Sequence, residues 1–394
     1  MPEPEILLDC RGAAGIITLN RPAALNAVTR AMVRTLGEAL ERWRQRAEIA
    51  TAALRALDDL RTRPAATLDG VRIRLEANLE IADEVGRVRD AGAEGIGLYR
   101  SEFLLDAMHQ SAATEDAQVE VYRMLLETMR PLPVTIRTFD AGEERWESAP
   151  KGSGHRERFG LRGIRAGLHY DERFRVQIRA LLRSAPFGML RILLPFVTSS
   201  EELRQARALI DDIGREIGLS SNVPIGAMIE VPGAALTVDH LAAHADFLSV
   251  GTNDLIQYTL AIDRTDERLA GHYEPRAPAV LRLLRAIAVA GRRARCDLAV
   301  CGEMAADPLL VALLIGFGFR TFSMTPAAIP VVKRGLGTLD SRTAAEAARL
   351  AVHATSADEV HRVLEPIADA MHRAAVAGRA EPAAHAVPAS GERP

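Results

Sequence analysis

Eight short apolar runs that alternate with helical stretches are the feature that most constrains the fold of this chain. The runs are rich in aliphatic and β-branched residues, and amphipathic stretches separate them. This strand–helix alternation builds a parallel sheet, and eight strands are the number that closes such a sheet into a barrel. We therefore predict an α/β fold, a (β/α)8 TIM-type barrel, over residues 67–367. The runs lie at 71–75, 95–99, 134–139, 191–196, 225–229, 247–250, 297–300 and 321–324.

The segments outside this barrel have patterns of their own. Residues 6–20 form two β-rich runs around a glycine-containing turn, and apolar residues recur at helical spacing from 25 to 43. We predict a hairpin-plus-helix unit over residues 1–45 and a helical linker over 46–66, which ends near Pro64. Residues 368–394 are rich in Ala, Pro and Gly, which predicts a disordered tail.

Charge and cysteine content exclude several classes of protein. With 49 Lys and Arg against 52 Asp and Glu, no basic field draws this chain of 394 residues to nucleic acid or to an anionic membrane surface. Cys10, Cys296 and Cys301 lack the spacing of a zinc site and are too few for a disulfide framework. The longest apolar stretch, 308–319, is too short to span a bilayer, and the first residues lack a basic signal region. We expect a cytoplasmic protein.

Polar side chains follow the predicted strands at the points where the strands end. In a βα barrel the carboxyl ends of the strands meet at one mouth, where catalytic residues gather. The sequence therefore predicts one site that combines carboxylates, guanidinium groups, an amide and a thiol. The residues concerned are Asn78, Arg100, Glu102, Arg137, Asp140, Glu230, Asn253, Asp254, Cys301, Glu303 and Ser323.

Two of these carboxylates could hold a metal ion. Glu230 and Asp254 are separated by one βα unit, so they could bind one divalent cation from neighbouring strands. Mg²⁺ suits this pair better than Ca²⁺, because Mg²⁺ takes few carboxylates and completes its shell with water and substrate oxygens. The alternative, in which each carboxylate only caps the helix that follows it, stays open.

Four arginines and one cysteine are further candidates. Arg100 and Arg137 directly follow apolar runs, and Arg162 and Arg264 lie further along their loops. Planar guanidinium donors match phosphate oxygens in bidentate fashion, which favours a phosphate site. In a chain this rich in arginine, most arginines are solvated surface charges, and Arg100 and Arg137 stand out because each directly follows an apolar run. The spacing of Cys301 alone favours a buried core cysteine over a reactive thiol.

A series of collinear segments carries a resemblance to a known family. The sequences of these segments are similar to the carboxyl-terminal, phosphoenolpyruvate-binding domain of enzyme I of the bacterial phosphotransferase system. Pyruvate phosphate dikinase and phosphoenolpyruvate synthase share several of them, whereas 97–103 and 322–326 point to enzyme I. The segments are Thr67–Gly70, Glu76–Leu79, Gly92–Leu105, Ile136–Asp140, Met228–Pro232, Ser249–Ala261, Cys301–Met304 and Phe322–Pro326.

The resemblance implies a role for each candidate. It implies that Glu230 and Asp254 bind Mg²⁺, that Asn253 contacts the phosphate, and that Cys301 gives a proton to C3 of the enolate to form pyruvate. It also implies that four arginines hold the phosphate and carboxylate of phosphoenolpyruvate. These are Arg100, Arg137, Arg162 and Arg264.

The same resemblance implies the reaction and the partners. In the family, the phosphoryl group passes to a histidine on a mobile domain and then to a small carrier protein. Sugar transport and nitrogen regulation both stay open as the downstream process. We therefore expect a phosphoenolpyruvate-protein phosphotransferase that acts as a homodimer. The phosphohistidine domain and the phosphocarrier protein would act in trans.

The chain departs from the family pattern at three places. The Gly-rich stretch ending in Thr-Ser-His, which carries the phosphorylated histidine, does not occur in this sequence. The family motif Asp-x-Gly-Gly-Asp-Lys corresponds to residues 140–145, where Glu143 replaces a glycine and adds charge and bulk beside the predicted phosphate site. The family motif Asn-Pro-x-Leu-Gly-x-Arg corresponds to residues 156–162, which also differ from it. Two alternatives stay open. One is a non-catalytic protein that binds phosphoenolpyruvate and Mg²⁺, or a decayed fusion protein, and the other is a lyase acting on a pyruvate enolate.

The amino-terminal segment carries a different resemblance. Residues Gly15–Pro22 followed by Ala24–Ala27 are similar to the hairpin and helix that open crotonase (enoyl-CoA hydratase) proteins. The oxyanion-hole residues of that family would lie further along, where this chain already has the barrel pattern. We therefore expect no hydratase activity from this segment.

Overall fold

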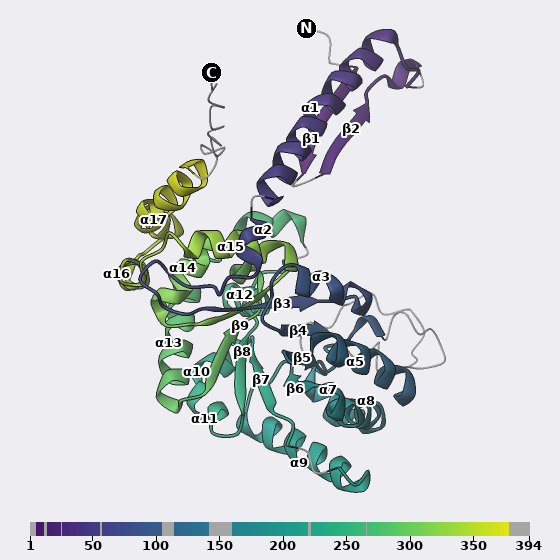
Figure 1. Cartoon of the computed structure of the whole chain (residues 1–394), viewed down its shortest axis with the longest axis vertical. Helices are drawn as coiled ribbons and strands as arrows, with labels where there is room; N and C mark the ends of the chain where they lie inside the picture. The colour runs from purple at the N-terminus through teal and green to yellow at the C-terminus, as the bar shows by residue number, and fades with distance from the viewer. Residues whose placement is uncertain are drawn as a thin grey trace, which may run out of the picture. The chain divides into compact units, whose positions relative to one another are not determined.

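The chain divides into two compact units, 1–59 and 60–394 (Figure 1). The computed structural model describes residues 5–11, 14–24, 26–55, 57–104, 114–141, 160–219, 222–264 and 266–377. Within these residues, no helix is both long and apolar enough to cross a membrane.

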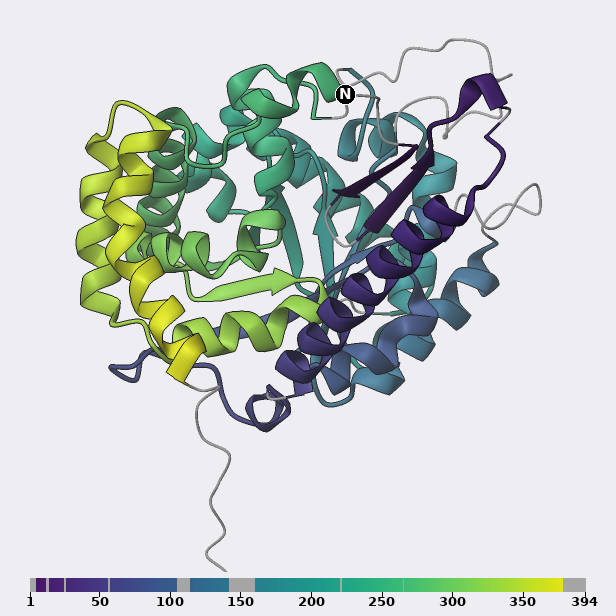
Figure 2. The same ribbon diagram turned by 90° about the horizontal axis from the view of Figure 1, so that it is seen from above.

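Eight parallel strands of the larger unit close into a barrel, which confirms the predicted fold (Figures 1 and 2). The ring runs β10-β3-β4-β5-β6-β7-β8-β9, and β10 closes it by pairing with β3, Thr321 opposite Arg74. The strands are β3 (Arg74–Leu79), β4 (Ile96–Arg100), β5 (Pro133–Arg137), β6 (Met189–Leu194), β7 (Ile225–Ile229), β8 (Phe247–Val250), β9 (Asp297–Val300) and β10 (Thr321–Met324).

The bounds of β7, β8, β9 and β10 coincide with the predicted runs, whereas β3 begins three residues after the predicted start at 71. The chain turns at 67–71 instead, since the Thr67 amide donates to the Val71 carbonyl at 3.0 Å. Gly70 in this turn has a φ of 85°, which a residue without Cβ adopts at little cost.

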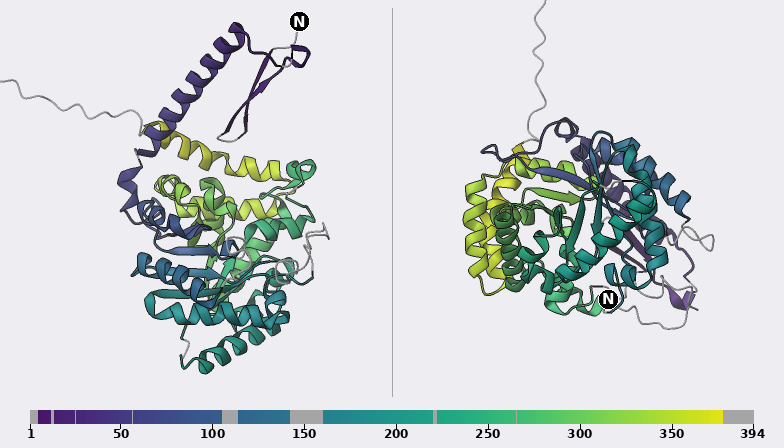
Figure 3. Two further views of the ribbon diagram at one scale, coloured as in Figure 1. Left: turned by 90° about the vertical axis from the view of Figure 1, so that its right-hand side faces the viewer. Right: turned by 90° about the horizontal axis from the view of Figure 1, so that it is seen from below.

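Helices surround the barrel (Figure 3). Local signals set their ends: Ser199 and Glu202 form a reciprocal capping box at the start of α9 (Ser200–Glu216). The further helices are α3 (Val85–Asp90), α5 (Glu115–Met129), α7 (Ile164–His169), α8 (Asp171–Ser184), α10 (Pro232–Leu236), α11 (Val238–Ala242), α12 (Thr252–Leu260), α13 (Pro278–Ala294), α14 (Pro308–Phe317), α15 (Ile329–Leu336), α16 (Ser341–His353) and α17 (Ala357–Ala377).

Helix α14 accounts for the longest apolar stretch of the sequence. It contacts α13, α15, α16 and α17, so it is covered on several sides and needs no polar face. Asp307 caps its start by accepting from the Leu309 amide at 2.8 Å, and Gly318 ends it with a φ of 112°. The stretch is therefore a core helix.

Helix α17 continues to Ala377, so residues 368–377 are helical and the expectation of disorder was wrong there. The Ala-rich composition of this segment shows no hydrophobic period, but alanine has the highest helix propensity. Ile367 is buried and Met371, one turn later, packs against the core. Residues 378–394 lie outside the described part of the chain.

The smaller unit has the predicted hairpin. Strands β1 (Ile6–Arg11) and β2 (Ala14–Leu19) pair antiparallel, with Ile6 opposite Leu19. Helix α1 spans Arg30–Arg55 and runs through position 45, where we expected one helix to give way to a second. Arg44 pairs with both Glu41 and Glu48 at 2.6 Å, so these ion pairs bridge the expected boundary. A short helix, α2 (Asp58–Arg61), follows.

Candidate active site

The predicted site residues gather at the carboxyl end of the barrel. Arg100 and Arg137 are the last residues of β4 and β5, and Glu230 and Cys301 directly follow β7 and β9. Asn253 and Asp254 lie in the first turn of α12, just after β8, while Arg162 precedes α7 and Arg264 follows α12.

A network of ion pairs joins three of the strands. Arg137 lies 3.1 Å from Glu102 and 3.2 Å from Asp140. Arg162 binds Asp140 in bidentate fashion, with Nε to Oδ1 at 2.8 Å and Nη2 to Oδ2 at 2.9 Å, and its Nη2 also donates to Asp254 Oδ2 at 2.7 Å. Asp140 thus holds both guanidinium groups in place, and Arg162 connects the loop after β5 to the loop after β8.

The network fixes the charges of its members. Burial alone would raise the pKa of Asp140, but the positive charges of Arg137 and Arg162 outweigh burial and hold this pKa at about 2. Burial would lower the pKa of each guanidinium group, but the carboxylates, Asp140 among them, raise it above its ordinary value. The two arginines therefore stay cationic at the mouth of the barrel, as a phosphate site requires.

Glu230 is a buried carboxylate with two negatively charged neighbours, Asp140 and Asp254. Its Oε1 accepts from the Phe196 amide at 2.6 Å, and its Oε2 packs so close to Gly251 that a Cβ there would lie 2.9 Å away. Burial, and then the negative charges of Asp140 and Asp254, raise the pKa of Glu230 to about 8. A divalent cation beside Glu230 and Asp254 would offset this repulsion.

The donor set therefore fits a magnesium ion that is held mainly by substrate and water. Among the described residues, no group of three or more His, Cys, Asp and Glu side chains gathers as a metal site. Two carboxylates are nevertheless a common protein contribution to Mg²⁺, which retains several waters and substrate oxygens. The carboxylates are Glu230 and Asp254, and both are buried.

The thiol of Cys301 is enclosed at the same mouth. It packs with Leu98, Leu193 and Met228 inside the barrel, and its Sγ lies 3.5 Å from the Val250 carbonyl oxygen. Burial raises the pKa of Cys301 to about 11, so the thiol keeps its proton at neutral pH. The burial agrees with the buried cysteine that the spacing alone favours. The role as proton donor, which the resemblance implies, stays a prediction.

Asn253 and Arg264 meet around one carboxylate at the rim. Asn253 accepts from the Glu303 amide at 2.8 Å and donates to Glu303 Oε1 at 3.0 Å. Arg264 lies 4.0 Å from both Glu303 and Asp254 and is partly exposed. The amide of Asn253 is thus fixed, whereas the Arg264 guanidinium group can move toward a ligand.

The Arg100 side chain forms an ion pair with Glu80 at the same rim. Its Nη1 donates to Glu80, and both side chains are partly exposed. Glu143, which replaces a family glycine, and the rest of residues 142–159 lie outside the described part of the chain.

Two residues of the site were missed in the sequence. Phe196 supplies the amide that binds Glu230, and its ring lies 5.0 Å from the Arg162 guanidinium carbon. Its φ of 60° is unusual for a residue with a side chain and turns the chain after β6. Tyr258 accepts from Arg162 Nη1 at 3.1 Å. The one available signal was position: Phe196 ends a predicted run, and Tyr258 lies inside the conspicuous segment 249–261.

Comparisons with known proteins agree with this geometry. The family described as PEP-utilising enzyme, PEP-binding domain matches residues 55–341, and enoyl-CoA hydratase/isomerase matches residues 14–59. A phosphoenolpyruvate-protein phosphotransferase of Cupriavidus necator is 42% identical over 308 residues, which are 75% of this chain and 52% of that protein. The corresponding protein of Staphylococcus epidermidis is 38% identical over 320 residues, 79% of this chain and 55% of its own.

The chain spans about half the length of these curated relatives. A Salmonella typhimurium protein named phosphoenolpyruvate-dependent phosphotransferase system is 41% identical over 309 residues, 76% of this chain and 41% of its own. The family match covers all eight strands of the barrel and every residue of the site described above. The chain therefore belongs to the family of PEP-utilising enzymes, through their PEP-binding domain.

Proposed function

We propose that this chain is the phosphoenolpyruvate-binding, catalytic barrel of a phosphoenolpyruvate-protein phosphotransferase of the enzyme I type. It would transfer the phosphoryl group of phosphoenolpyruvate to a histidine supplied in trans and release pyruvate. The observation that carries this proposal is the convergence of two largely buried, paired arginines with two carboxylates and a protonated thiol. These are Arg137, Arg162, Glu230, Asp254 and Cys301.

The arginines would bind the anionic groups of the substrate. Arg137 and Arg162 are held by Asp140, so they pay little conformational entropy when a phosphate binds. Arg100 and Arg264 are partly exposed at the rim and can turn toward the phosphate or the carboxylate. A bound phosphate would replace Asp254 as the partner of Arg162.

Glu230 and Asp254 would hold Mg²⁺ once Arg162 has released the Asp254 carboxylate. When bound, Mg²⁺ would supply positive charge that offsets the negative charge of the phosphate and of the developing enolate. The amide of Asn253, fixed by Glu303, would contact the phosphate from the same loop as Asp254.

Cys301 would complete the reaction by donating a proton. The bond between phosphorus and the substrate oxygen breaks as a bond from phosphorus to the histidine nitrogen forms, and the electron pair stays on the substrate as an enolate. C3 of the enolate then takes the proton of the Cys301 thiol, which gives pyruvate and leaves a thiolate that solvent reprotonates. A pKa of about 11 suits this role, because the proton is present at neutral pH.

The proposal extends to partners and setting. We expect a cytoplasmic homodimer that works with a phosphohistidine domain and a phosphocarrier protein in sugar transport. A Rhodobacter capsulatus relative named multiphosphoryl transfer protein, 38% identical over 321 residues, supports a phosphoryl-transfer setting.

The test is phosphoryl transfer in trans. The chain is mixed with the part of the Cupriavidus necator phosphotransferase that it does not match, Mg²⁺ and ³²P-labelled phosphoenolpyruvate. The resemblance implies that this part carries the acceptor histidine, and labelling of that histidine is measured. We expect labelling that requires this chain, and the variant Arg137→Leu should abolish it. Calorimetric binding of phosphoenolpyruvate without labelling would reduce the chain to a binding protein, and the absence of both would overturn the proposal.

A further inference from the structure

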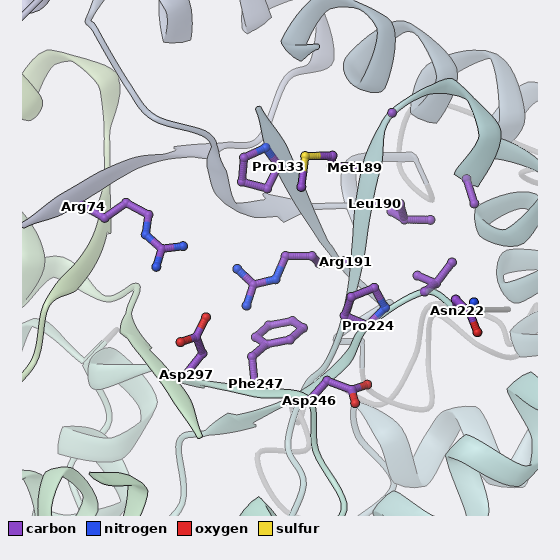
Figure 4. A pocket seen from close by; sticks show the side chains of 13 residues that line it. Arg74, Pro133, Met189, Leu190, Arg191, Asn222, Pro224, Asp246, Phe247 and Asp297 are labelled. Carbon is purple, nitrogen blue, oxygen red and sulfur yellow. The ribbon is translucent and has the colours of Figure 1, made fainter. Parts of the chain in front are cut away.

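A cavity lies at the amino-terminal end of the barrel (Figure 4). Its volume is about 630 Å³, and it is lined by residues at or just before the starts of β3, β5, β6, β7, β8 and β9. Because all eight strands are parallel, the starts of the strands lie at the opposite end from Glu230 and Cys301. This cavity is therefore separate from the site described above.

Charged side chains from three strands point into the cavity. Arg74 of β3, Arg191 of β6 and Asp297 of β9 converge on its centre (Figure 4). Among the described residues, no carboxylate lies within ion-pair distance of either guanidinium group. Two cations that face one space raise each other's energy, and an anion between them would lower it.

The arginine of β6 is held in position by its neighbours. The guanidinium carbon of Arg191 lies 3.8 Å from the centre of the Phe247 ring, a cation–π contact. The ring can lie there because residue 226 is glycine, where a Cβ would come within 2.4 Å of it. Burial lowers the pKa of Arg191 from its ordinary value, as expected for a desolvated cation.

The carboxylates near this positive charge act on it from beyond ion-pair distance, Glu76 and Asp297 among them. Asp246 lines the cavity, but its Oδ2 accepts from Arg207 at 2.8 Å and from the Ile225 amide at 2.7 Å. Glu76 lies two residues beyond Arg74 on the same face of β3 and is buried. Burial raises the pKa of Glu76, which favours its neutral form. Asp297 faces both arginines across the cavity (Figure 4).

We propose that this cavity binds a small organic oxyanion, a phosphate monoester or a carboxylate, through Arg74 and Arg191. The planar guanidinium groups would hold the oxyanion, and Asp297 would accept from a hydroxyl or ammonium group of the ligand. Met189, Pro133 and Pro224 provide an apolar wall for its organic part. The volume exceeds what inorganic phosphate would fill, so an organic ligand is favoured.

The experiment uses methionine methyl groups as reporters for both ends of the barrel. Met189 lines the cavity, and Met228 packs with Cys301 and lies 3.9 Å from Arg137 at the mouth. The full chain is labelled with ¹³C-methyl methionine, and Met189→Leu and Met228→Leu assign the two signals. Phenyl phosphate, benzoate and inorganic phosphate are then titrated separately, so that the three arms distinguish the oxyanion and the need for an organic body.

We expect phenyl phosphate or benzoate to shift the Met189 signal in a saturable way, more tightly than inorganic phosphate does. The variants Arg74→Gln and Arg191→Leu should weaken this binding at least tenfold, because each removes one guanidinium group. The matched variant Arg100→Gln, which removes an arginine from the other end, should leave the Met189 titration unchanged.

A conservative variant and melting temperatures separate a loss of binding from a loss of folding. Arg191→Lys retains the charge but loses the planar fork, and it should weaken the Met189 titration by about threefold. Ligand-free melting temperatures identify any variant that does not fold. A Met189 response that is absent or linear in the unmodified chain, or that is equal in the folded Arg74→Gln and Arg191→Leu variants, would overturn the proposal.

Discussion

The two ends of the barrel use arginine in opposite ways. At the carboxyl end, Arg137 and Arg162 share Asp140, and their positions are fixed by ion pairs of 2.8–3.2 Å. At the amino end, Arg74 and Arg191 face a cavity and, within the described residues, have no carboxylate at ion-pair distance. A paired arginine is positioned in advance and retains its charge, whereas an arginine that faces a cavity without an ion pair is open to an anionic ligand.

The buried carboxylates at the two ends should respond most differently to neutralisation. Asp140→Asn removes the charge that Arg137 and Arg162 share, and breaking such a buried network should cost about 3 kcal/mol in the free energy of unfolding. The matched variant Glu76→Gln replaces a carboxyl whose neutral form burial already favours, so it should cost less than about 1 kcal/mol. Urea denaturation measures both, and equal costs would contradict the distinction.

The two cysteines provide the next comparison. Cys301→Ala removes the proposed proton donor and should slow pyruvate formation about a hundredfold, within the range of general acid catalysis. Labelling of the histidine in a single turnover should be much less affected, because it does not require the proton. Cys296→Ala, just before β9 at the other end of the barrel, should change neither rate. Equal loss of labelling and of pyruvate would argue that Cys301 only shapes the site.

The fold could be predicted from the sequence to within a few residues, because parallel strands that are buried on both faces appear as continuous apolar runs. Strands β7, β8 and β10 are buried along their whole length, whereas β9 is buried only at Val300, and the predicted bounds of all four were correct. The runs gave no sign that the chain turns at 67–71, since Val71 and Ile73 continue the apolar alternation of β3. The helix break near position 45 was wrong, because residues 38–55 contain no glycine or proline and Arg44 pairs across it.

The candidate site could be predicted where one rule applied, namely that a polar residue follows a strand. The rule found Arg137, Glu230 and Cys301, and the structure brings them to one mouth. It could not find Phe196, which contributes a backbone amide that carries no side-chain signal. The amino-end cavity was missed because an arginine near the start of a strand, such as Arg191, has the sequence pattern of a solvent-exposed strand end.

The pH dependence of metal binding would sharpen the account of the carboxyl end. A protonated carboxyl cannot bind a cation, and the pKa of Glu230 is raised to about 8. Affinity for Mn²⁺, a paramagnetic substitute for Mg²⁺, should therefore increase roughly fivefold from pH 7 to pH 8 and level off above. Asp140, with a pKa of about 2, stays ionised throughout this range. Electron paramagnetic resonance measures free Mn²⁺, and a flat profile that Glu230→Gln does not change would contradict the assignment.

The smallest effect is expected at the exposed rim, where Arg100 is paired with Glu80. Both side chains are partly exposed, so Glu80→Gln should change the free energy of unfolding by less than about 1 kcal/mol. The same variant releases Arg100 for substrate and should tighten phosphoenolpyruvate binding about twofold at low salt, with less effect at high salt because ions screen the rim. Glu127→Gln, which breaks an exposed pair with Arg123 on α5, should cost as little stability and leave affinity unchanged. If calorimetry finds the same affinity in both variants, Arg100 does not contact the substrate, and only the buried arginines distinguish the carboxyl end from the amino end.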